Sequence, residues 1–252
     1  MSIGAFIIAR LSSSRLPEKN ILEIMGKSMI EKMAERVKAT ERVDKVIITT
    51  SSQSSDDQLE SISKEIGVGC YRGSLDNIMD RIIKASKTYE CDTIVELLGD
   101  NPLVHSALID DVVEFFLEGE YDYAANVTRE YPVSGSEYKL FPIGVRVQVY
   151  SIDAAERYKD YSEYINNKHK HPCSYIFEHP ESFRIGYFEA KGKWAFISRP
   201  NLNFAVNYQE NLDMIRRIFE LCYPQNSNFS MREIIRTIKE NPDLKSLMGT
   251  QS

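Results

Sequence analysis

The sequence lacks the features that place a protein in a membrane or in an oxidising compartment. No stretch approaches the roughly 18 consecutive apolar residues of a membrane span, and no secretory leader precedes the short apolar run at residues 3–9. The four cysteines, Cys70, Cys91, Cys173 and Cys222, show no C-x-x-C spacing, so a zinc site is not expected. Free thiols suit a reducing compartment, and we therefore expect a cytoplasmic protein without a membrane partner.

An excess of basic residues is also missing. The chain holds 31 lysines and arginines against 37 acidic residues, and its formal net charge is −6. Proteins that bind nucleic acid usually carry a broad basic footprint, so we expect no nucleic-acid partner. A small anionic ligand needs only a few cations in one place. Local basic clusters are therefore more informative here than the net charge.

The first half of the chain alternates strand-like and helix-like segments. Residues 3–9 form a continuous apolar run, as expected for a strand that is buried on both faces of a sheet. Further strands are predicted at 45–50, 69–71, 93–98 and 121–127, and helices at 28–40, 56–66, 76–89 and 106–117. This alternation predicts right-handed βαβ units, and hence an α/β fold with a mostly parallel central sheet flanked by helices.

The pattern changes after about residue 128. An antiparallel strand is predicted at 143–149, a helix at 151–164, a strand at 184–190, amphipathic helices at 212–221 and 231–239, and a frayed tail at 241–252. We interpret residues 1–252 as a single domain in which residues 128–200 contain an inserted β-rich arm.

A basic loop follows the first predicted strand. It reads A-R-L-S-S-S-R-L-P-E-K, with cations at Arg10, Arg15 and Lys19 and hydroxyls at Ser12, Ser13 and Ser14. In open α/β sheets, ligands bind at the carboxyl ends of the strands. Hydroxyl and backbone N–H donors together with cations can wrap a polyphosphate. The loop contains no G-x-x-x-x-G-K-[ST] and no G-x-G-x-x-G, so it is neither a P-loop nor a Rossmann dinucleotide site. The alternative is a solvated surface loop.

A carboxylate follows another predicted strand. The strand at 93–98 runs into Gly99, Asp100 and then Pro102. Asp100 therefore faces the same edge of the sheet as the basic loop. Magnesium in proteins typically binds one or two carboxylates together with substrate phosphates, which suits Asp100. The alternative is that Asp100 only caps the turn before Pro102.

A third segment, Tyr71-Arg72-Gly73-Ser74, also follows a strand and precedes a helix. Its functional interpretation is that Arg72 and Ser74 face the base or ribose of a nucleotide. The alternative is that Ser74 or Asp76 caps the helix.

In this order and at these spacings, the three segments resemble the cytidylyltransferase family. Residues 9–19 match its A-R-x-x-S-x-R-L-P-x-K loop, residues 26–30 are similar to G-K-P-[ML]-[IL], residues 71–81 to its R-G-S-x-D segment, and residues 99–103 to G-D-x-P-L. The family includes the synthetases of CMP-activated 3-deoxy-octulosonic acid and of CMP-activated sialic acids. The sequence is most similar to the spore-coat-polysaccharide branch.

The resemblance implies a nucleotide-diphospho-sugar transferase fold and a transfer of CMP from CTP, with release of pyrophosphate. The matching positions implied to bind the nucleotide are Ala9, Arg10, Ser12, Ser13, Arg15, Lys19, Arg72 and Ser74; those implied to be catalytic are Arg10, Arg15, Lys19 and Asp100. Asp100 would hold Mg²⁺. The implied partners are CTP, an acidic small-molecule acceptor and a second copy of the chain, which would dimerise through the arm at 128–200.

The sequence departs from the family pattern at two places. Many relatives carry a second metal-binding aspartate where this chain has Asn207, whose amide oxygen brings no charge. The branch has acidic residues where this chain has Arg146. We assign Arg146 and His171 to binding of the acceptor. Two other functions stay open: a glycosyltransferase on a similar fold, or a nucleotide-binding relative with weakened catalysis.

Overall fold

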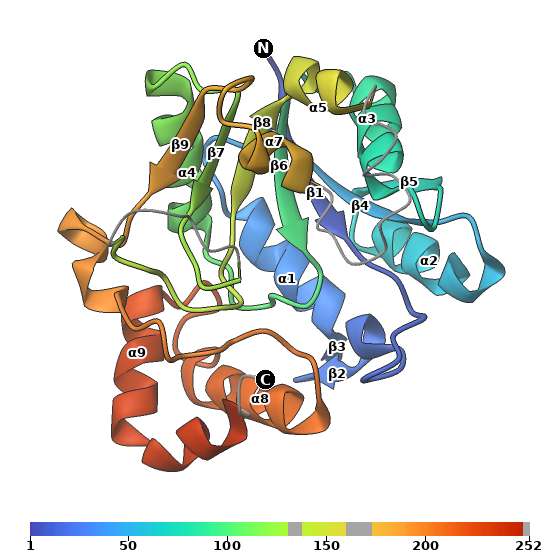
Figure 1. Ribbon diagram of the computed structural model, residues 1–252. Helices are drawn as coiled ribbons and strands as arrows, with labels where there is room; N and C mark the ends of the chain where they lie inside the picture. Colours follow the sequence, from blue (N-terminus) through green and yellow to red (C-terminus); the bar gives the residue numbers. More distant parts are fainter. Residues whose placement is uncertain (131–137, 160–172, 249–252) are drawn as a thin grey trace.

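A seven-stranded sheet with helices on both faces organises the protein (Figure 1). The structure, a computed structural model, describes residues 1–130, 138–159 and 173–248. In the order of the sheet, the strands are β5 (Gly69–Gly73), β4 (Lys45–Ser51), β1 (Ile3–Ile8), β6 (Thr93–Leu98), β8 (Gln148–Ser151), β7 (Tyr123–Asn126) and β9 (Ile185–Phe188). A separate small hairpin pairs β2 (Glu23–Ile24) with β3 (Lys27–Ser28).

Strand direction confirms the predicted mostly parallel sheet. β5, β4, β1 and β6 run parallel to one another, and β7 runs parallel to β9. Only β8 among these strands is antiparallel to both of its neighbours, β6 and β7. The carboxyl ends of β1, β4, β5, β6 and β7 therefore lie at one edge of the sheet, together with the amino end of β8.

The helices form two layers, one on each face of the sheet. α1 (Met29–Lys38), α2 (Asp57–Glu65) and α4 (Ser106–Glu118) pack on one face, and α3 (Ile78–Thr88), α5 (Ile152–Lys159) and α7 (Ser174–Glu178) pack on the other. α8 (Gln209–Cys222) and α9 (Met231–Glu240) extend the first layer below the carboxyl edge of the sheet (Figure 1). Short 3-10 helices are η1 (Lys19–Ile21), η2 (Ser54–Asp56), η3 (Gly192–Ile197) and η4 (Pro242–Met248).

Local sequence signals account for where several helices begin. Ser28 caps α1 by accepting a hydrogen bond from the backbone N–H of Glu31, and the Glu31 side chain accepts one from the backbone N–H of Ser28. Ser230 and Glu233 repeat this capping box at α9. Each box satisfies N–H groups that the first turn of a helix leaves unpaired.

The interval 128–200 does not form a separate β-rich unit in the part that the structure describes. Its two strands, β8 and β9, belong to the central sheet. Residues 131–137 and 160–172 of this interval lie outside the described residues. The use of the interval for dimerisation stays a prediction.

The prediction of a frayed tail at 241–252 is wrong for residues 242–248. These residues form η4, in which Leu244 and Met248 are buried in the main core. The Asn211 side chain of α8 also donates a hydrogen bond to the Leu247 carbonyl at 3.2 Å. The apolar residues of the tail recur at a helical spacing, so they reach the core and anchor the tail to α8. Charged residues between them made this spacing hard to recognise in the sequence. Within the described residues, no helix has the length and apolar character needed to cross a membrane.

Candidate active site

The basic loop begins at the carboxyl end of β1 and is fixed there by a buried carboxylate. Asp56 is fully buried, and its Oδ1 accepts a hydrogen bond from the Leu11 N–H at 2.8 Å. Its Oδ2 accepts from Thr50 Oγ1 at 3.0 Å and from Ser51. Burial opposes ionisation of Asp56, but the hydrogen bonds from Ser51, Leu11 and Thr50 outweigh it and lower the pKa of the carboxyl. The sequence analysis placed Asp56 only at the start of a helix.

The loop then turns outward and returns on itself. The Glu18 N–H donates to the Leu11 carbonyl at 3.0 Å, and the Asn20 side chain donates to the Arg10 carbonyl at 2.9 Å. Arg10, Ser12 and Arg15 are exposed, Ser13 is half-buried and Ala9 is buried. These two hydrogen bonds close the loop at its ends, and most of the side chains between them are exposed to solvent. A soluble anion can therefore reach them.

Lys19 ends this loop and points inward, so the expectation that it lies in an exposed loop is wrong. The residue is 9% exposed and begins η1. Its Nζ donates to Asp100 Oδ2 at 2.7 Å and to the Val206 carbonyl at 2.9 Å. Since Val206 also donates its N–H to the Asp100 carbonyl at 2.9 Å, the three segments meet at one point. The structure therefore brings Lys19 and Asp100 together at the carboxyl edge of the sheet.

Gly99 lets the basic loop approach the end of β6 closely. Its N–H donates to the Ile8 carbonyl at 2.9 Å. A Cβ at this position would lie 2.8 Å from that carbonyl oxygen and 2.9 Å from Asn20 Oδ1. A larger residue would push the loop away from Asp100, so the glycine before the aspartate is required by packing.

Asn207 presents an unpaired oxygen beside this junction. Its Oδ1 is buried and has no hydrogen-bond partner among the described residues, while its backbone N–H donates to Asn211 Oδ1 at 3.1 Å. Both polar atoms of the Asn101 side chain, which is 1% exposed, are likewise buried without a partner in the described structure. Buried polar groups in native proteins normally have partners, so these atoms are available to a ligand or to water.

The donor atoms at this junction suit magnesium. Asp100 offers a carboxylate that is 24% exposed, and Asn207 offers an amide oxygen. Hard oxygen ligands of this kind, completed by substrate phosphates and water, are what Mg²⁺ prefers. The described residues contain no group of three or more His, Cys, Asp or Glu side chains that could hold a metal by themselves. A metal ion here would therefore depend on oxygens brought by a ligand.

Arg15 of the basic loop lies near Tyr208, the residue that follows Asn207. The Arg15 guanidinium lies 6.0 Å from the centroid of the Tyr208 ring, at the outer limit of a cation–π contact. Tyr208 is 49% exposed, which is unusual for a large aromatic residue in this protein. The pair thus places an exposed cation next to an exposed aromatic ring, one residue from Asn207.

Arg81 is a cation near the site to which the sequence analysis gave no role. It is 2% exposed, and its Nη1 donates to the Ser74 carbonyl at 2.9 Å. The pKa of Arg81 is lowered to about 10, mainly by burial; Asp56 opposes this shift and Arg10 adds to it. The available signal was the position of Arg81 at the end of the segment at 71–81.

Arg72 and Ser74 are engaged in the scaffold at the edge of the sheet. The Arg72 guanidinium pairs with Asp57 at 2.6 Å and with Glu60 at 3.0 Å, both on α2. The hydrogen bonds that Arg72 donates, first to Glu60 and then to Asp57, raise the pKa of Arg72. Ser74 Oγ accepts from the Asn77 N–H at 3.0 Å and so supports the start of α3. Their proposed contact with the cytidine stays a prediction.

Arg146 lies next to the site at the amino end of β8. It is 5% exposed; its Nη2 donates to the Tyr123 hydroxyl at 3.0 Å, and its Nη1 to Thr128 Oγ1 at 3.4 Å. Thr128 in turn donates to Glu130 at 3.2 Å. Burial raises the pKa of Glu130, Arg146 opposes this shift and Asp100 adds to it. No motif in the sequence pointed to Glu130, whose carboxyl group interacts electrostatically with both Arg146 and Asp100. His171 lies outside the described residues.

A buried carboxyl group supports Arg146 from within the sheet. Glu96 of β6 is 1% exposed and accepts hydrogen bonds from Tyr150 at 2.7 Å, Cys173 at 2.9 Å and Gln148 at 3.1 Å. Burial raises the pKa of Glu96. Gln148 also accepts from the Tyr123 hydroxyl at 2.6 Å, and that hydroxyl accepts from Arg146. A chain of hydrogen bonds therefore runs from Glu96 to Arg146. Residues 93–98 were predicted as a strand, and no role was predicted for Glu96.

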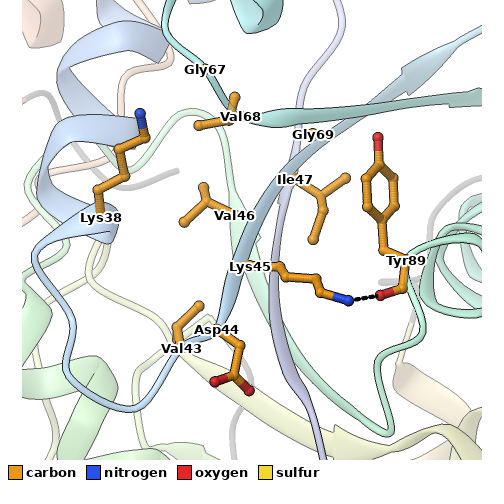
Figure 2. A pocket seen from close by; sticks show the side chains of 10 residues that line it. All are labelled: Lys38, Val43, Asp44, Lys45, Val46, Ile47, Gly67, Val68, Gly69 and Tyr89. Carbon is orange, nitrogen blue, oxygen red and sulfur yellow. Dashed lines mark hydrogen bonds between the residues drawn. The ribbon is translucent and has the colours of Figure 1, made fainter.

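A hollow elsewhere on the sheet does not belong to this site. Figure 2 shows it between the amino ends of β4 and β5, where Lys45, Gly69 and Tyr89 are among the lining residues. Its volume is about 340 Å³. Lys45 donates to the Tyr89 carbonyl there. Because these strand ends lie at the opposite edge of the sheet, the hollow is separate from Lys19 and Asp100.

Known proteins are similar to this chain over nearly its whole length. The chain is 29% identical over 251 residues to an uncharacterised protein of Methanocaldococcus jannaschii, across 98% of this chain and 94% of that protein. It is 25% identical over 243 residues to the spore coat polysaccharide biosynthesis protein SpsF of Bacillus subtilis, across 94% of this chain and 95% of that protein. A cytidylyltransferase structure from Leptospira borgpetersenii aligns at a TM-score of 0.85 and 26% identity, across 100% of this chain and 98% of the other.

A sequence model of the cytidylyltransferase family matches residues 5–242. The match confirms the resemblance inferred from the loop at residues 9–19 and from the Gly99-Asp100 turn. Because it spans nearly the whole chain, this protein belongs to the cytidylyltransferase family and is a nucleotidyltransferase.

Proposed function

We propose that this protein uses CTP and Mg²⁺ to activate an acidic, sugar-like acceptor for the synthesis of a surface polysaccharide or glycan. An acceptor hydroxyl oxygen attacks the α-phosphorus of CTP. The bond from that phosphorus to the bridging oxygen of the β-phosphate breaks, pyrophosphate leaves, and the hydroxyl proton passes to solvent. The observation that carries the proposal is the junction of Lys19, Asp100 and Val206 directly below the exposed cations of the basic loop.

The residues of the basic loop bind the triphosphate in this proposal. Arg10 and Arg15 are exposed and free to turn toward phosphate oxygens, and Lys19 adds a third cation from the floor of the site. A hydrogen bond to a charged group contributes about 1.5–3 kcal/mol, so three such contacts supply about 4.5–9 kcal/mol, and the upper end of this range corresponds to micromolar binding. Catalysis then consists mainly of holding the reacting groups in line and neutralising charge.

Asp100 and Asn207 hold the magnesium ion in this proposal. When bound, the ion neutralises the charge that develops on the phosphates. Asp100 is fixed by its backbone contact with Val206, and Asn207 by its N–H bond to Asn211.

Arg146 supports an acidic acceptor. It is a buried cation next to the site, supplied with hydrogen-bond partners by Tyr123 and Thr128. A guanidinium fits the two oxygens of a carboxylate, which is the group that distinguishes an acidic sugar from a neutral one. The synthetases of octulosonic and sialic acids named for this family act on acceptors of that kind, and the SpsF relative belongs to polysaccharide biosynthesis. We also propose that His171 contacts the acceptor and that the active form is a homodimer.

The test is a screen of pyrophosphate release. All four nucleoside triphosphates are combined with octulosonic, nonulosonic and phosphonic acids in the presence of Mg²⁺. We expect release with CTP and at least one acid, and little with UTP, ATP or GTP. Release that is equal for all four nucleotides would refute the cytidine assignment, and release that needs no acid would refute the acceptor class.

A further inference from the structure

Lys19 occupies a cation position at Asp100. Its Nζ lies 2.7 Å from Asp100 Oδ2 and 2.9 Å from the Val206 carbonyl oxygen. These are a carboxylate and a carbonyl, which are also the oxygen types that bind a divalent cation. The Lys19 side chain is 11% exposed and the Asp100 side chain 24% exposed, so the pair is shielded from water.

We propose that Lys19 is an internal counter-cation that keeps a divalent ion out of the site until a triphosphate arrives. In the free protein, the ammonium group takes the carboxylate oxygen that the ion needs. Phosphate oxygens of the incoming nucleotide then draw Lys19 away from Asp100, and the ion enters with them. This inference rests on the proposed nucleotide site but concerns only residues of this chain.

The charges around Asp100 support this order of binding. Asp100 contributes one negative charge, Lys19 one positive charge, and Asn207 none. A divalent ion that entered alone would leave three positive charges against one carboxylate. The negative charge of Glu130 also acts on Asp100, but the positive charge of Arg146 offsets the charge of Glu130. A triphosphate brings the missing negative charge, so positive charge at the site is then no longer in excess.

Distance also argues against simultaneous occupation of Oδ2. An Mg²⁺–oxygen bond is about 2.1 Å long, so an ion on that oxygen would lie within roughly 5 Å of Lys19 Nζ. Two cations at that separation repel each other, and repulsion is stronger in a partly buried site than in water. In addition, the Oδ1 of Asn207 is buried without a partner in the described structure, and an uncharged oxygen cannot offset the repulsion.

The test titrates Mn²⁺ into the protein without nucleotide and follows free Mn²⁺ by electron paramagnetic resonance. Native protein should bind the ion weakly, with Kd above about 1 mM. Lys19→Met removes the charge and keeps an unbranched chain, and we expect it to strengthen Mn²⁺ binding at least tenfold. Adding Asp100→Asn to this variant should abolish the gain.

Lys27→Met is the matched control. It removes the same charge from an exposed lysine that pairs with Glu35, and it should change Mn²⁺ binding less than twofold. Lys19→Gln is the second variant, for use if Lys19→Met strongly lowers the melting temperature. We expect it to preserve the fold, because glutamine retains an N–H donor toward Asp100 and Val206. It should show the same gain in Mn²⁺ affinity.

Three results would overturn the proposal: micromolar binding of Mn²⁺ by the native free protein, no gain in either Lys19 variant, or an equal gain in Lys27→Met. None of these measurements includes CTP or an acceptor. Failure of the proposed function in the pyrophosphate screen is therefore distinguishable from failure of this inference.

Discussion

Replacing Asn207 with aspartate isolates the effect of charge at the metal site. The two side chains have the same shape, and Asn207 Oδ1 has no hydrogen-bond partner to lose among the described residues. The substitution therefore adds one negative charge beside Asp100 with little structural change. We expect Asn207→Asp to lower the Mg²⁺ concentration needed for half-maximal turnover.

The size of this effect follows from the position of Asn207 between water and the protein interior. At about 4 Å, a pair of unit charges gains ~1 kcal/mol in water and ~4 kcal/mol at an effective dielectric constant near 20. Repulsion from Asp100 removes part of this gain, and Lys19, which already contacts the neighbouring Val206, competes for the new carboxylate. A net gain of about 1.4–2.8 kcal/mol corresponds to a 10- to 100-fold lower Mg²⁺ requirement.

The assay measures pyrophosphate release against Mg²⁺ concentration at saturating CTP and acceptor. Asn203→Asp is the control, since it adds the same charge to the same segment at a residue whose Oδ1 is occupied by the Ala205 N–H at 3.0 Å. A native chain that is saturated at low Mg²⁺, and is not improved by Asn207→Asp, would refute the reasoning. A silent native chain rescued by Asn207→Asp would instead identify a nucleotide-binding relative that has lost turnover.

Three further predictions concern the loop, the carboxylate and the anchor of the site. Arg15→Ala should weaken CTP binding by about 1.5–3 kcal/mol in calorimetry, while Arg217→Ala on α8 should not; equal affinities would mean that Arg15 is only a surface residue. Asp100→Asn should reduce turnover at least ~100-fold, about 2.7 kcal/mol, and near-normal turnover at low Mg²⁺ would show that the carboxylate is structural. The lowered pKa of Asp56 stabilises the fold above its ordinary value of about 3.9 and ceases to do so as pH falls through the lowered value. Asp56→Asn should therefore lower the melting temperature at pH 7, and the difference from native protein should shrink below about pH 4; a constant difference would contradict the hydrogen-bond account.

The parallel half of the fold was predictable because its strands are buried on both faces. The apolar runs at residues 3–9 and 93–98 correspond closely to β1 and β6. The position of Asp100 was predictable for the same reason, since the carboxyl ends of parallel strands all lie at one edge of the sheet. The family resemblance rested on the same feature, because its specific motifs occupy that edge.

Other parts of the site were not predictable because they depend on contacts between distant segments. Lys19 looks like a surface lysine in a polar loop, and its burial depends on Val206, a residue 187 positions away. Arg72 matches a family motif, yet two carboxylates of α2 surround its guanidinium. Glu96 sits in an apolar strand, and its partners come from β8 and from Cys173. Local patterns do not contain this information.

The junction of Lys19, Asp100 and Val206 has a consequence for synthesis of the chain. During translation, the basic loop and the end of β6 emerge long before Val206, which supplies both a carbonyl to Lys19 and an N–H to Asp100. Until residue 206 is synthesised, Lys19 and Asp100 therefore lack these two hydrogen bonds. Chains truncated before residue 206 contain every cation of the loop and yet leave Lys19 without its second anchor. They also lack α8, α9 and η4, whose buried residues belong to the same core as β1 and β6, so the last fifth of the sequence completes the site and the core together.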